Sequence, residues 1–327
     1  MRSFLRHDYI TDIILLIIMK IAIIGAGWFG CHIANKLKQS HQVSIFDGDG
    51  IFSQASLKNQ NRLHMGYHYA RSSTTRLLCR TTFIKFKTDY ESLLSNVPNN
   101  VYAVPERESI IDFKTYIKIF SDFDFQIADH DYLNNVSGAI SVNEKHINPF
   151  LAQSYFIREL DHLLTRKDID NVGSLSLSYD LVINCTNNTL NPITHQSFVQ
   201  PCTIFVYKKI DDTPFDALTL VDGPLFSIFP YYKNMFTISD VEYTPDSSLT
   251  YSDRAQKIED KICYYYPEFH EKFKYDSYMK AVKAKPVDMS DNRAPVITME
   301  NNVVNCFGGK IQGIYYLEDY VRNLCEF

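Results

Sequence analysis

Three glycines near the start of the chain have the spacing that binds a pyrophosphate. They lie in the segment GAGWFG at residues 25–30, which directly follows the apolar run at residues 20–24. In such a strand–turn–helix unit, the first glycine permits the tight turn, the second lets phosphates approach the backbone, and the third lets the helix pack closely. The N-terminus of the helix then faces the negative charge. The residues expected to contact the ligand here are Gly25, Gly27, Trp28, Phe29 and Gly30.

An acidic residue stands where the adenosine ribose of such a ligand would lie. A second predicted strand, residues 42–46, ends at Asp47. This carboxylate follows the glycine turn by about 20 residues, the usual distance for a side chain that accepts hydrogen bonds from ribose hydroxyls. Together the two features predict a dinucleotide site.

The composition is that of a globular protein and excludes several kinds of partner. A chain of 327 residues, 45% of them apolar, can form two domains or one large one. The net charge is -5 and no basic block is present, so we expect no nucleic-acid partner. The seven cysteines include no CxxC pair, which favours reduced thiols in a cytoplasmic protein. We find neither a Ser/His/Asp triad nor metal-ligand spacing, and we expect no metal.

The residues before the first strand are interpreted as an extension. Residues 13–19 are apolar and follow Arg2 and Arg6, but Lys20 ends the run. The run is far shorter than the ~20 residues that cross a bilayer, so we expect no membrane partner. We interpret residues 1–18 as a dispensable extension from a misassigned start, with residues 1–19 outside the first domain. A short membrane-associated helix is the alternative, and mass spectrometry of the native N-terminus distinguishes the two.

The elements that must position these residues alternate between strands and helices. We expect helices at residues 28–39, 74–94, 112–124, 149–164, 252–264 and 311–324. We expect strands at residues 20–24, 42–46, 101–104, 109–111 and 181–185, and short antiparallel strands across residues 202–243. The buried face of the helix at 74–94 is expected to contain Leu77, Leu78, Phe83, Phe86, Tyr90 and Leu93. Asn148 and Pro149 have the residue types that open a helix, and the long polar segment 48–70 is expected to bind a ligand.

Further segments carry a resemblance to a known family. After the glycine turn and Asp47 come NRLHMGYHY at 61–69, INP at 147–149, DLVINCT at 180–186, KP at 285–286 leading through Asp291 to PVI at 295–297, and GGKIQG at 308–313. In this order they resemble the glycine oxidase/D-amino-acid oxidase (DAO) family of FAD-dependent oxidoreductases, over most of residues 20–325. The resemblance implies an α/β protein: a Rossmann-like FAD-binding domain with an inserted, mainly antiparallel α+β substrate domain. The implied FAD-binding segments are 20–98, 146–195 and 286–327, and the substrate domain comprises 99–145 and 196–285.

The resemblance also assigns site residues. The implied FAD contacts beyond the first turn are Asn61, Arg62, Leu63, His64, Thr186, Gly308, Gly309, Lys310, Ile311, Gln312 and Gly313. The implied catalytic residues are His64 beside the flavin, Lys310 near its pyrimidine edge and Lys285 as a substrate anchor. Arg293 is a second candidate anchor, because a guanidinium is better suited to a carboxylate or phosphate. The final helix would point its positive end at the flavin and stabilise the charge of the reduced form.

Two departures from the family pattern qualify the activity. Asn187 replaces the usual glycine, and Lys285 replaces an arginine that grips the substrate carboxylate through a bidentate fork. A lysine cannot reproduce that fork, so amino-acid oxidation is not carried over.

The predicted function is oxidation of a C–H next to an amine or hydroxyl of a small polar substrate, an amine, hydroxy acid or sugar derivative, by hydride transfer to flavin N5. Three alternatives stay open: a non-redox flavin-dependent sugar isomerase or mutase, a catalytically silent FAD-binding module, and an NAD-dependent dehydrogenase. The electron acceptor is left unassigned.

Overall fold

A computed structural model describes residues 18–193, 197–211, 217–245, 247–287 and 292–325. Its first layer is a six-stranded sheet in the order β16-β17-β10-β1-β2-β9. The strands are β1 (Lys20–Ile24), β2 (Gln42–Phe46), β9 (Leu164–Thr165), β10 (Leu181–Asn184), β16 (Val296–Glu300) and β17 (Val303–Phe307). Every neighbouring pair is parallel except β16 and β17.

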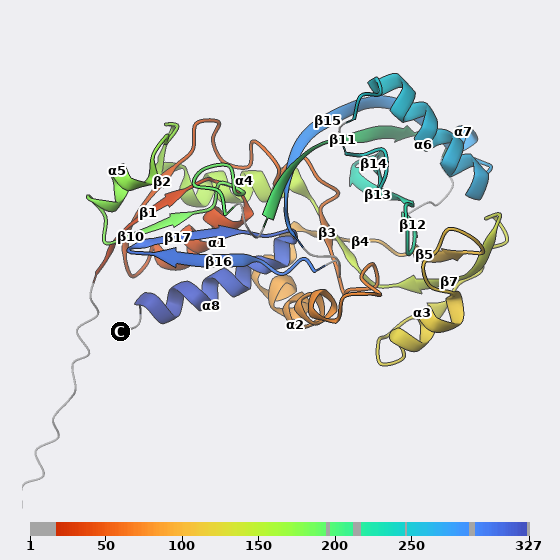
Figure 1. Cartoon of the computed structure of the whole chain (residues 1–327), viewed down its shortest axis with the longest axis horizontal. Coiled ribbons are helices and arrows are strands. Elements are labelled where there is room, and N and C mark those ends of the chain that lie inside the picture. Colours follow the sequence, from red (N-terminus) through yellow and green to blue (C-terminus); the bar gives the residue numbers. More distant parts are fainter. Residues whose placement is uncertain (1–17, 194–196, 212–216, 246, 288–291, 326–327) are drawn as a thin grey trace, which may run out of the picture.

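Alternation along β1 explains how this sheet is covered. Ile21 and Ile23 point into the core formed with α1 (Trp28–Leu37), α4 (Pro149–Leu160) and α8 (Ile314–Cys325). Ala22 and Ile24 point to the opposite face, where Val172 of α5 (Val172–Ser176) packs. Because both faces are buried, β1 is apolar from Ile21 to Ile24. Figure 1 shows α8 lying along this sheet beside α1.

The second layer is an eight-stranded, mainly antiparallel sheet in the order β15-β11-β14-β13-β12-β5-β7-β6. Its strands are β5 (Asn100–Pro105), β6 (Gln126–Ile127), β7 (Val136–Val142), β11 (Ser197–Lys209), β12 (Ala217–Leu220), β13 (Phe226–Tyr232), β14 (Met235–Asp240) and β15 (Phe273–Pro286). The long β11–β15 pair curves over the sheet and continues toward the first layer (Figure 1). Residues of α6 (Tyr251–Tyr265) and α7 (Phe269–Lys272) pack against one part of the sheet, and α3 (Phe113–Ile119) packs against another.

A small third sheet joins these layers. It pairs β3 (Arg62–Leu63) and β4 (Leu94–Asn96) with the central β8 (Lys145–Ile147). Helix α2 (Ser73–Tyr90) connects β3 to β4 through η1 (Glu91–Leu93), and η2 (Asp161–Leu163) follows α4. The last 3-10 turn, η3 (Ile311–Gly313), leads into α8.

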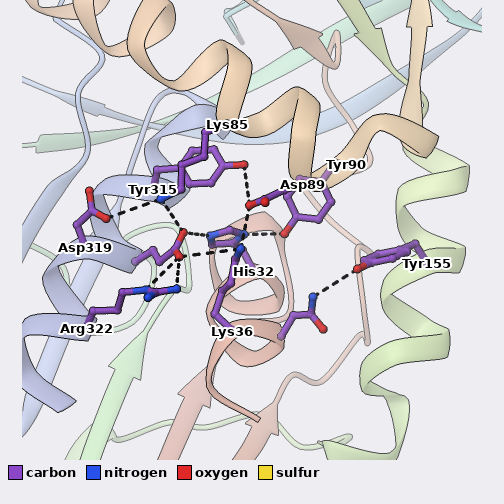
Figure 2. A network of polar contacts seen from close by, with 11 residues as sticks. His32, Lys36, Lys85, Asp89, Tyr90, Tyr155, Tyr315, Asp319 and Arg322 are labelled. Carbon is purple, nitrogen blue, oxygen red and sulfur yellow. Dashed lines mark hydrogen bonds and ion pairs between the residues drawn. The ribbon is translucent and has the colours of Figure 1, made fainter. Parts of the chain in front are cut away.

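A polar network fixes the helix that follows the glycine turn. His32 of α1 is fully buried, with Tyr90 Oη 2.6 Å from its Nδ1 and Glu318 Oε2 3.0 Å from its Nε2. Lys85 and Arg322 also contact the Glu318 carboxylate, at 3.2 and 2.9 Å. Figure 2 shows these side chains converging from α1, α2 and α8. The network therefore holds α1 against α2 and α8.

Most predicted elements are confirmed, including the α/β class with a second, mainly antiparallel sheet whose strands come between pieces of the first. Asn148 caps α4 by accepting from the N–H groups of Phe150 and Leu151, and Pro149 is its first residue. The domain boundaries stay a prediction.

Three predictions are wrong. Leu77 is 58% exposed because it lies on the outer face of α2, while the other five members of its predicted face are buried. Residues 109–111 form a bend rather than a strand, and the helix that follows ends at Ile119 instead of residue 124. The 14-residue strand β15 was not predicted. Residues 1–17 and Asp291 lie outside the described residues.

Candidate flavin and substrate site

A cavity of about 1320 Å³ lies where the three sheets approach one another. The carboxyl ends of β1, β10 and β17 form one end, and residues of β11, β12, β13 and β15 line the other. Ligands of open parallel sheets bind at this edge of the strands. The cavity exceeds the usual range of about 300–1,000 Å³ for small-molecule sites, which suits a dinucleotide together with a substrate.

The first glycine turn is a cradle that side chains would fill. Gly25 has a φ of +96°, and a Cβ atom there would lie 2.7 Å from the carbonyl oxygen of Cys185. A Cβ atom at Gly27 would lie 2.7 Å from Ser56 Oγ, and one at Gly30 only 1.9 Å from the carbonyl oxygen of Gly25. Gly25 and Gly27 line the cavity, whereas Gly30 sets the close packing of α1 on the turn. These are the roles that a pyrophosphate site requires.

Asp47 lies at the end of β2 and lines the same part of the cavity. Its Oδ2 atom accepts from the Ala26 N–H at 2.7 Å, and its Oδ1 atom accepts from the N–H groups of Asp49 and Gly50. The carboxylate is therefore oriented by the turn itself, and it remains the candidate ribose ligand.

The second glycine segment closes the cavity near the C-terminus. Cβ atoms at Gly308 and Gly313 would lie 2.8 and 3.0 Å from the ring of Phe29, so both glycines let this segment approach α1. Gly308, Gly309, Lys310 and Ile311 line the cavity, while the Gln312 side chain is buried behind it. The Lys310 ammonium lies 4.5 Å from the centre of the Tyr69 ring.

Gln312 connects this segment to the loop that contains His64. Its Oε1 atom accepts from the His64 N–H at 3.2 Å, and its Nε2 atom donates to the His64 carbonyl at 2.9 Å. Nε2 also donates to the Cys79 carbonyl at 2.9 Å. Two parts of the chain that were predicted to contact the flavin are thus fixed relative to each other.

His64 lines the cavity beside a buried carboxylate. Glu144 is fully buried in the turn between β7 and β8, and its Oε1 atom lies 3.6 Å from His64 Nδ1. Burial, followed by the charge of Lys310, lowers the pKa of His64 to about 4. Burial alone would raise the pKa of Glu144, but His64 and the hydrogen bonds from Tyr102 and Met65 outweigh it, and the pKa is lowered. The pair is therefore a neutral imidazole next to a carboxylate anion.

Arg62 is a buried cation at the same end of the cavity. It is 5% exposed, donates from one terminal nitrogen to Thr219 Oγ1 at 2.7 Å, and lies 4.1 Å above the ring of Phe229. Among the described residues, its Nε and other terminal nitrogen have no hydrogen-bond partner. Since Arg62 and His64 are two residues apart in an extended segment, both side chains lie on its cavity side, whereas Leu63 packs into the core.

The two predicted substrate anchors both line the cavity and are half-buried. Lys285 lies near the end of β15, opposite Phe198 of β11. Arg293 donates its backbone N–H to Thr75 Oγ1 at 2.9 Å, and a Cβ atom at Gly309 would lie 3.0 Å from its Cδ. The structure therefore brings both cations to the cavity. In the sequence they flank residues 288–291, which the structure does not describe.

The departure at Asn187 has a conformational explanation. Asn187 follows β10 and has a φ of +55°, in the left-handed region. Asparagine adopts this region more readily than other non-glycine residues, so it can replace the glycine of the family pattern. The preceding Thr186 lines the cavity and donates its hydroxyl to Asn184 Oδ1 at 2.8 Å.

The structure brings most predicted site residues to one cavity. Those that line it are Gly25, Gly27, Trp28, Phe29, Asp47, Asn61, Arg62, His64, Thr186, Lys285, Arg293, Gly308, Gly309, Lys310 and Ile311. Gly30, Leu63, Gln312 and Gly313 lie behind it.

Sequence reasoning missed four residues: His68, Arg71, Glu144 and Asp222. Three of them line the cavity, with Arg71 bonded to Asp222 at 3.3 Å, and Glu144 supports His64. His68 lies in a segment already singled out, but nothing in the sequence around Glu144 indicates a site.

Two further findings concern partners. Across the described ranges, no helix is long and apolar enough to cross a bilayer. The same residues contain no group of three or more His, Cys, Asp or Glu side chains placed to hold a metal ion.

Comparison with known proteins identifies the family. No protein-family model matches the chain. FAD-dependent monooxygenase FPY4 from Fusarium mangiferae is 32% identical over 337 residues, covering 94% of this chain and 91% of the relative. FAD-dependent monooxygenase kojA from Aspergillus flavus is 24% identical over 357 residues, covering 90% and 83%.

Solved structures show the same fold at lower identity. Glycine oxidase from Geobacillus kaustophilus superposes with a TM-score of 0.76 at 14% identity, over 94% of each chain. L-amino acid deaminase from Proteus vulgaris gives a TM-score of 0.70 at 12% identity, over 93% of this chain and 89% of the other. The glycine cradle and the size of the cavity fit FAD, which replaces the nicotinamide alternative. The chain therefore belongs to the family of FAD-dependent monooxygenases that includes FPY4, and it is a FAD-dependent oxidoreductase with the fold of glycine oxidase.

Proposed function

We propose that this FAD-dependent oxidoreductase oxidises a C–H next to a hydroxyl or amine of a small polar substrate, with hydride transfer to flavin N5. The observation that carries the proposal is one continuous cavity. It runs from the glycine cradle at residues 25–30 to the polar side chains of Arg62 and His64 beside the second sheet. A dinucleotide and a small substrate would share this cavity, with the reacting groups at its polar end.

Each part of the chain would have a separate task. The backbone N–H groups at Gly25 and Gly27 and the start of α1 would bind the pyrophosphate, and Asp47 would bind the ribose. Lys310 and the start of η3 would stabilise negative charge at the flavin. Lys285 and Arg293 would attract an anionic or hydroxylated substrate. When bound, FAD supplies the electron-accepting chemistry.

The first experiment is the visible spectrum of the purified protein, recorded before and after acid precipitation. Yellow colour released into the supernatant indicates non-covalent FAD, and colour retained in the pellet indicates covalent attachment, for which His64 is the candidate. Anaerobic bleaching by a substrate then demonstrates the proposed half-reaction. A colourless protein that also takes up no added FAD would refute the site.

Insertion of an oxygen atom is a second candidate, because FPY4 and kojA are both named monooxygenases. The two reactions differ in the fate of oxygen. Labelled dioxygen yields labelled product in a monooxygenation and labelled hydrogen peroxide in a simple oxidation. A flavoenzyme isomerase or mutase would instead convert substrate only after prior reduction, with no net electron transfer.

We also place the protein in the cytoplasm. None of the seven cysteines, all of which the structure describes, forms a disulfide, and four of them are buried. Unoxidised thiols in this number are typical of a reducing compartment. Fractionation of the native cells tests this placement.

A further inference from the structure

We infer that His64 and Glu144 form a carboxylate–histidine pair that removes the hydroxyl proton of the substrate, so that the substrate class is a primary or secondary alcohol. This inference rests on the proposed function and narrows it. His64 would be the catalytic base at the reacting end of the cavity, and Glu144 would be a positioning residue that never touches substrate.

Glu144 is built into the fold as a fixed anion. Its Oε1 atom accepts from the backbone N–H groups of Met65 and Gly66 at 2.7 and 3.3 Å. Its Oε2 atom accepts from Tyr102 Oη at 2.6 Å and from the side-chain amide of Asn100 at 3.4 Å. Four donors on a fully buried carboxylate favour the charged form. They also fix its orientation toward the residue just before Met65, which is His64.

The His64 ring has one nitrogen toward Glu144 and one toward the cavity. Nδ1 is buried, has no hydrogen-bond partner among the described residues, and lies 3.6 Å from Glu144 Oε1. A carboxylate at this side favours a proton on Nδ1, which leaves the lone pair on Nε2. Because His64 lines the cavity, Nε2 is the nitrogen left to meet a substrate. Separations slightly beyond hydrogen-bond length are common in such pairs before substrate binds.

The other charged groups around His64 keep its ring neutral. The neighbouring His68, in the loop after β3, is itself neutral, because burial lowers its pKa well below the usual range. Lys310 approaches from the segment before η3 and Arg62 from β3, and the charge of each lowers the pKa of His64. Glu144 has the opposite effect. Burial and these cations lower the pKa of His64 to about 4, so the imidazole can accept a proton at neutral pH.

The chemistry of an alcohol needs such an acceptor, whereas that of an amine does not. When an alcohol carbon loses its C–H hydrogen with the electron pair to FAD, the hydroxyl oxygen must lose its proton to become a carbonyl. His64 Nε2 would take that proton, FAD would take the hydride, and Glu144 would balance the imidazolium charge. A neutral amine can expel the hydride with its own lone pair and keep its N–H protons in the iminium product. A buried base with a dedicated counter-ion therefore favours a hydroxyl substrate.

The protonation state of His64 can be tested without turnover. We would label the histidines of the FAD-loaded protein with ¹⁵N, record the ring-nitrogen signals at neutral pH, and assign His64 by its loss in His64→Gln. We expect a neutral ring with its proton on Nδ1, and a shift of that signal in Glu144→Gln, which keeps an acceptor for the two backbone N–H groups. The control His146→Gln removes a buried imidazole of β8 that does not line the cavity, and it should leave the His64 signal unchanged. A charged His64, or a proton on Nε2, would overturn the inference.

The substrate class is tested by anaerobic flavin reduction. The probes are glycerol, D-glucose and L-lactate as alcohols, and glycine, sarcosine and L-proline as amines. We expect bleaching by an alcohol, and a decrease of about 10²–10⁴-fold in its rate in His64→Gln at unchanged FAD content. Glu144→Gln should slow the same step and shift its pH profile, while His146→Gln should do neither.

The outcomes separate the inference from the proposed function. Failure to bind FAD would overturn the proposed function itself, whereas FAD bonded covalently to His64 would overturn only the present inference, because that ring could not accept the substrate proton. Bleaching by amines alone, or an unchanged rate in His64→Gln, would overturn the alcohol inference and leave the FAD oxidation standing. If neither class bleaches the flavin, the ¹⁵N signals of His64 are the test. A neutral ring with its proton on Nδ1 supports the inference, and a charged ring or a proton on Nε2 overturns it.

Discussion

Gln312 bonds the backbone of His64 in both directions, accepting from its N–H at 3.2 Å and donating to its carbonyl at 2.9 Å. The two residues are 248 positions apart in the chain. His64 lies at the reacting end of the cavity, and Gln312 belongs to the glycine segment 308–313 that precedes α8. Through this contact, the position of His64 depends on the C-terminal part of the chain.

Gln312→Leu should therefore loosen the His64 loop. Leucine fills the space but leaves the N–H and carbonyl of His64 and the carbonyl of Cys79 without their partner. Each unsatisfied buried group costs about 1–3 kcal/mol. We expect lower stability in urea denaturation and weaker FAD retention on gel filtration. Gln256→Leu, which removes an exposed glutamine of α6, is the control, and equal behaviour of the two variants would contradict the prediction.

Gly27→Val and Gly30→Ala should fail in different ways. The valine side chain at Gly27 would occupy the pyrophosphate position, so we expect a folded protein that retains no flavin. The new methyl at Gly30 would lie 1.9 Å from the carbonyl oxygen of Gly25, so we expect α1 to shift and the protein itself to lose stability. Flavin content and thermal melting of each purified variant distinguish these effects. Normal flavin content in Gly27→Val would refute the placement of the cofactor.

Acid should weaken the network around Glu318. Burial alone would raise the pKa of Glu318, but the hydrogen bond and charge of His32, together with Lys36, outweigh it and lower the pKa to about 2. A lowered folded-state pKa means that the stabilisation is complete above the unfolded-state pKa of about 4.3 and is lost as the pH falls toward about 2.

We therefore expect Glu318→Gln to be less stable than the wild type near neutral pH, by roughly 1–3 kcal/mol. The difference should shrink below about pH 4.3. Urea denaturation across this pH range measures it. Asp319→Asn should show little difference at any pH, because the Asp319 side chain is 70% exposed, although it lies beside Lys85, which also contacts Glu318. If the difference in the free energy of unfolding between the wild type and Glu318→Gln stays constant with pH, the ionisation of Glu318 does not stabilise the fold.

Arg62→Met should have little effect on the stability of the FAD-free protein. The guanidinium is buried without a carboxylate partner among the described residues, and replacing such a charge by an apolar side chain is often neutral or stabilising. We expect a change within about 1 kcal/mol, together with reduced binding of flavin or substrate. Arg254→Met is the matched comparison, because Arg254 is also buried but donates from both terminal nitrogens, to Pro245 and Thr203, whereas Arg62 donates from one; it should be clearly destabilised. If Arg62→Met loses as much stability as Arg254→Met, Arg62 is structural rather than a ligand-binding residue.

The sequence by itself determined the local units of this protein. The strand–turn–helix at residues 20–37 is recognisable from local sequence. Gly25 permits the tight turn, and Gly27 lets phosphates approach the backbone. The capped start of α4 at Asn148 is local in the same sense. These units were enough to predict a dinucleotide site, whereas the fold class and FAD were implied by the resemblance that runs over most of residues 20–325.

Only the tertiary structure decided which residues surround the reacting end of the cavity. Glu144 contacts a backbone N–H group 79 residues earlier, and no periodicity or spacing indicates such a contact. Leu77 has an apolar side chain but lies on the outer face of α2. Which face of the helix is buried depends on how the whole helix packs, not on its composition. Hydrogen bonds and packing between distant segments depend on how the sheets are assembled. The sequence near each residue does not predict that arrangement.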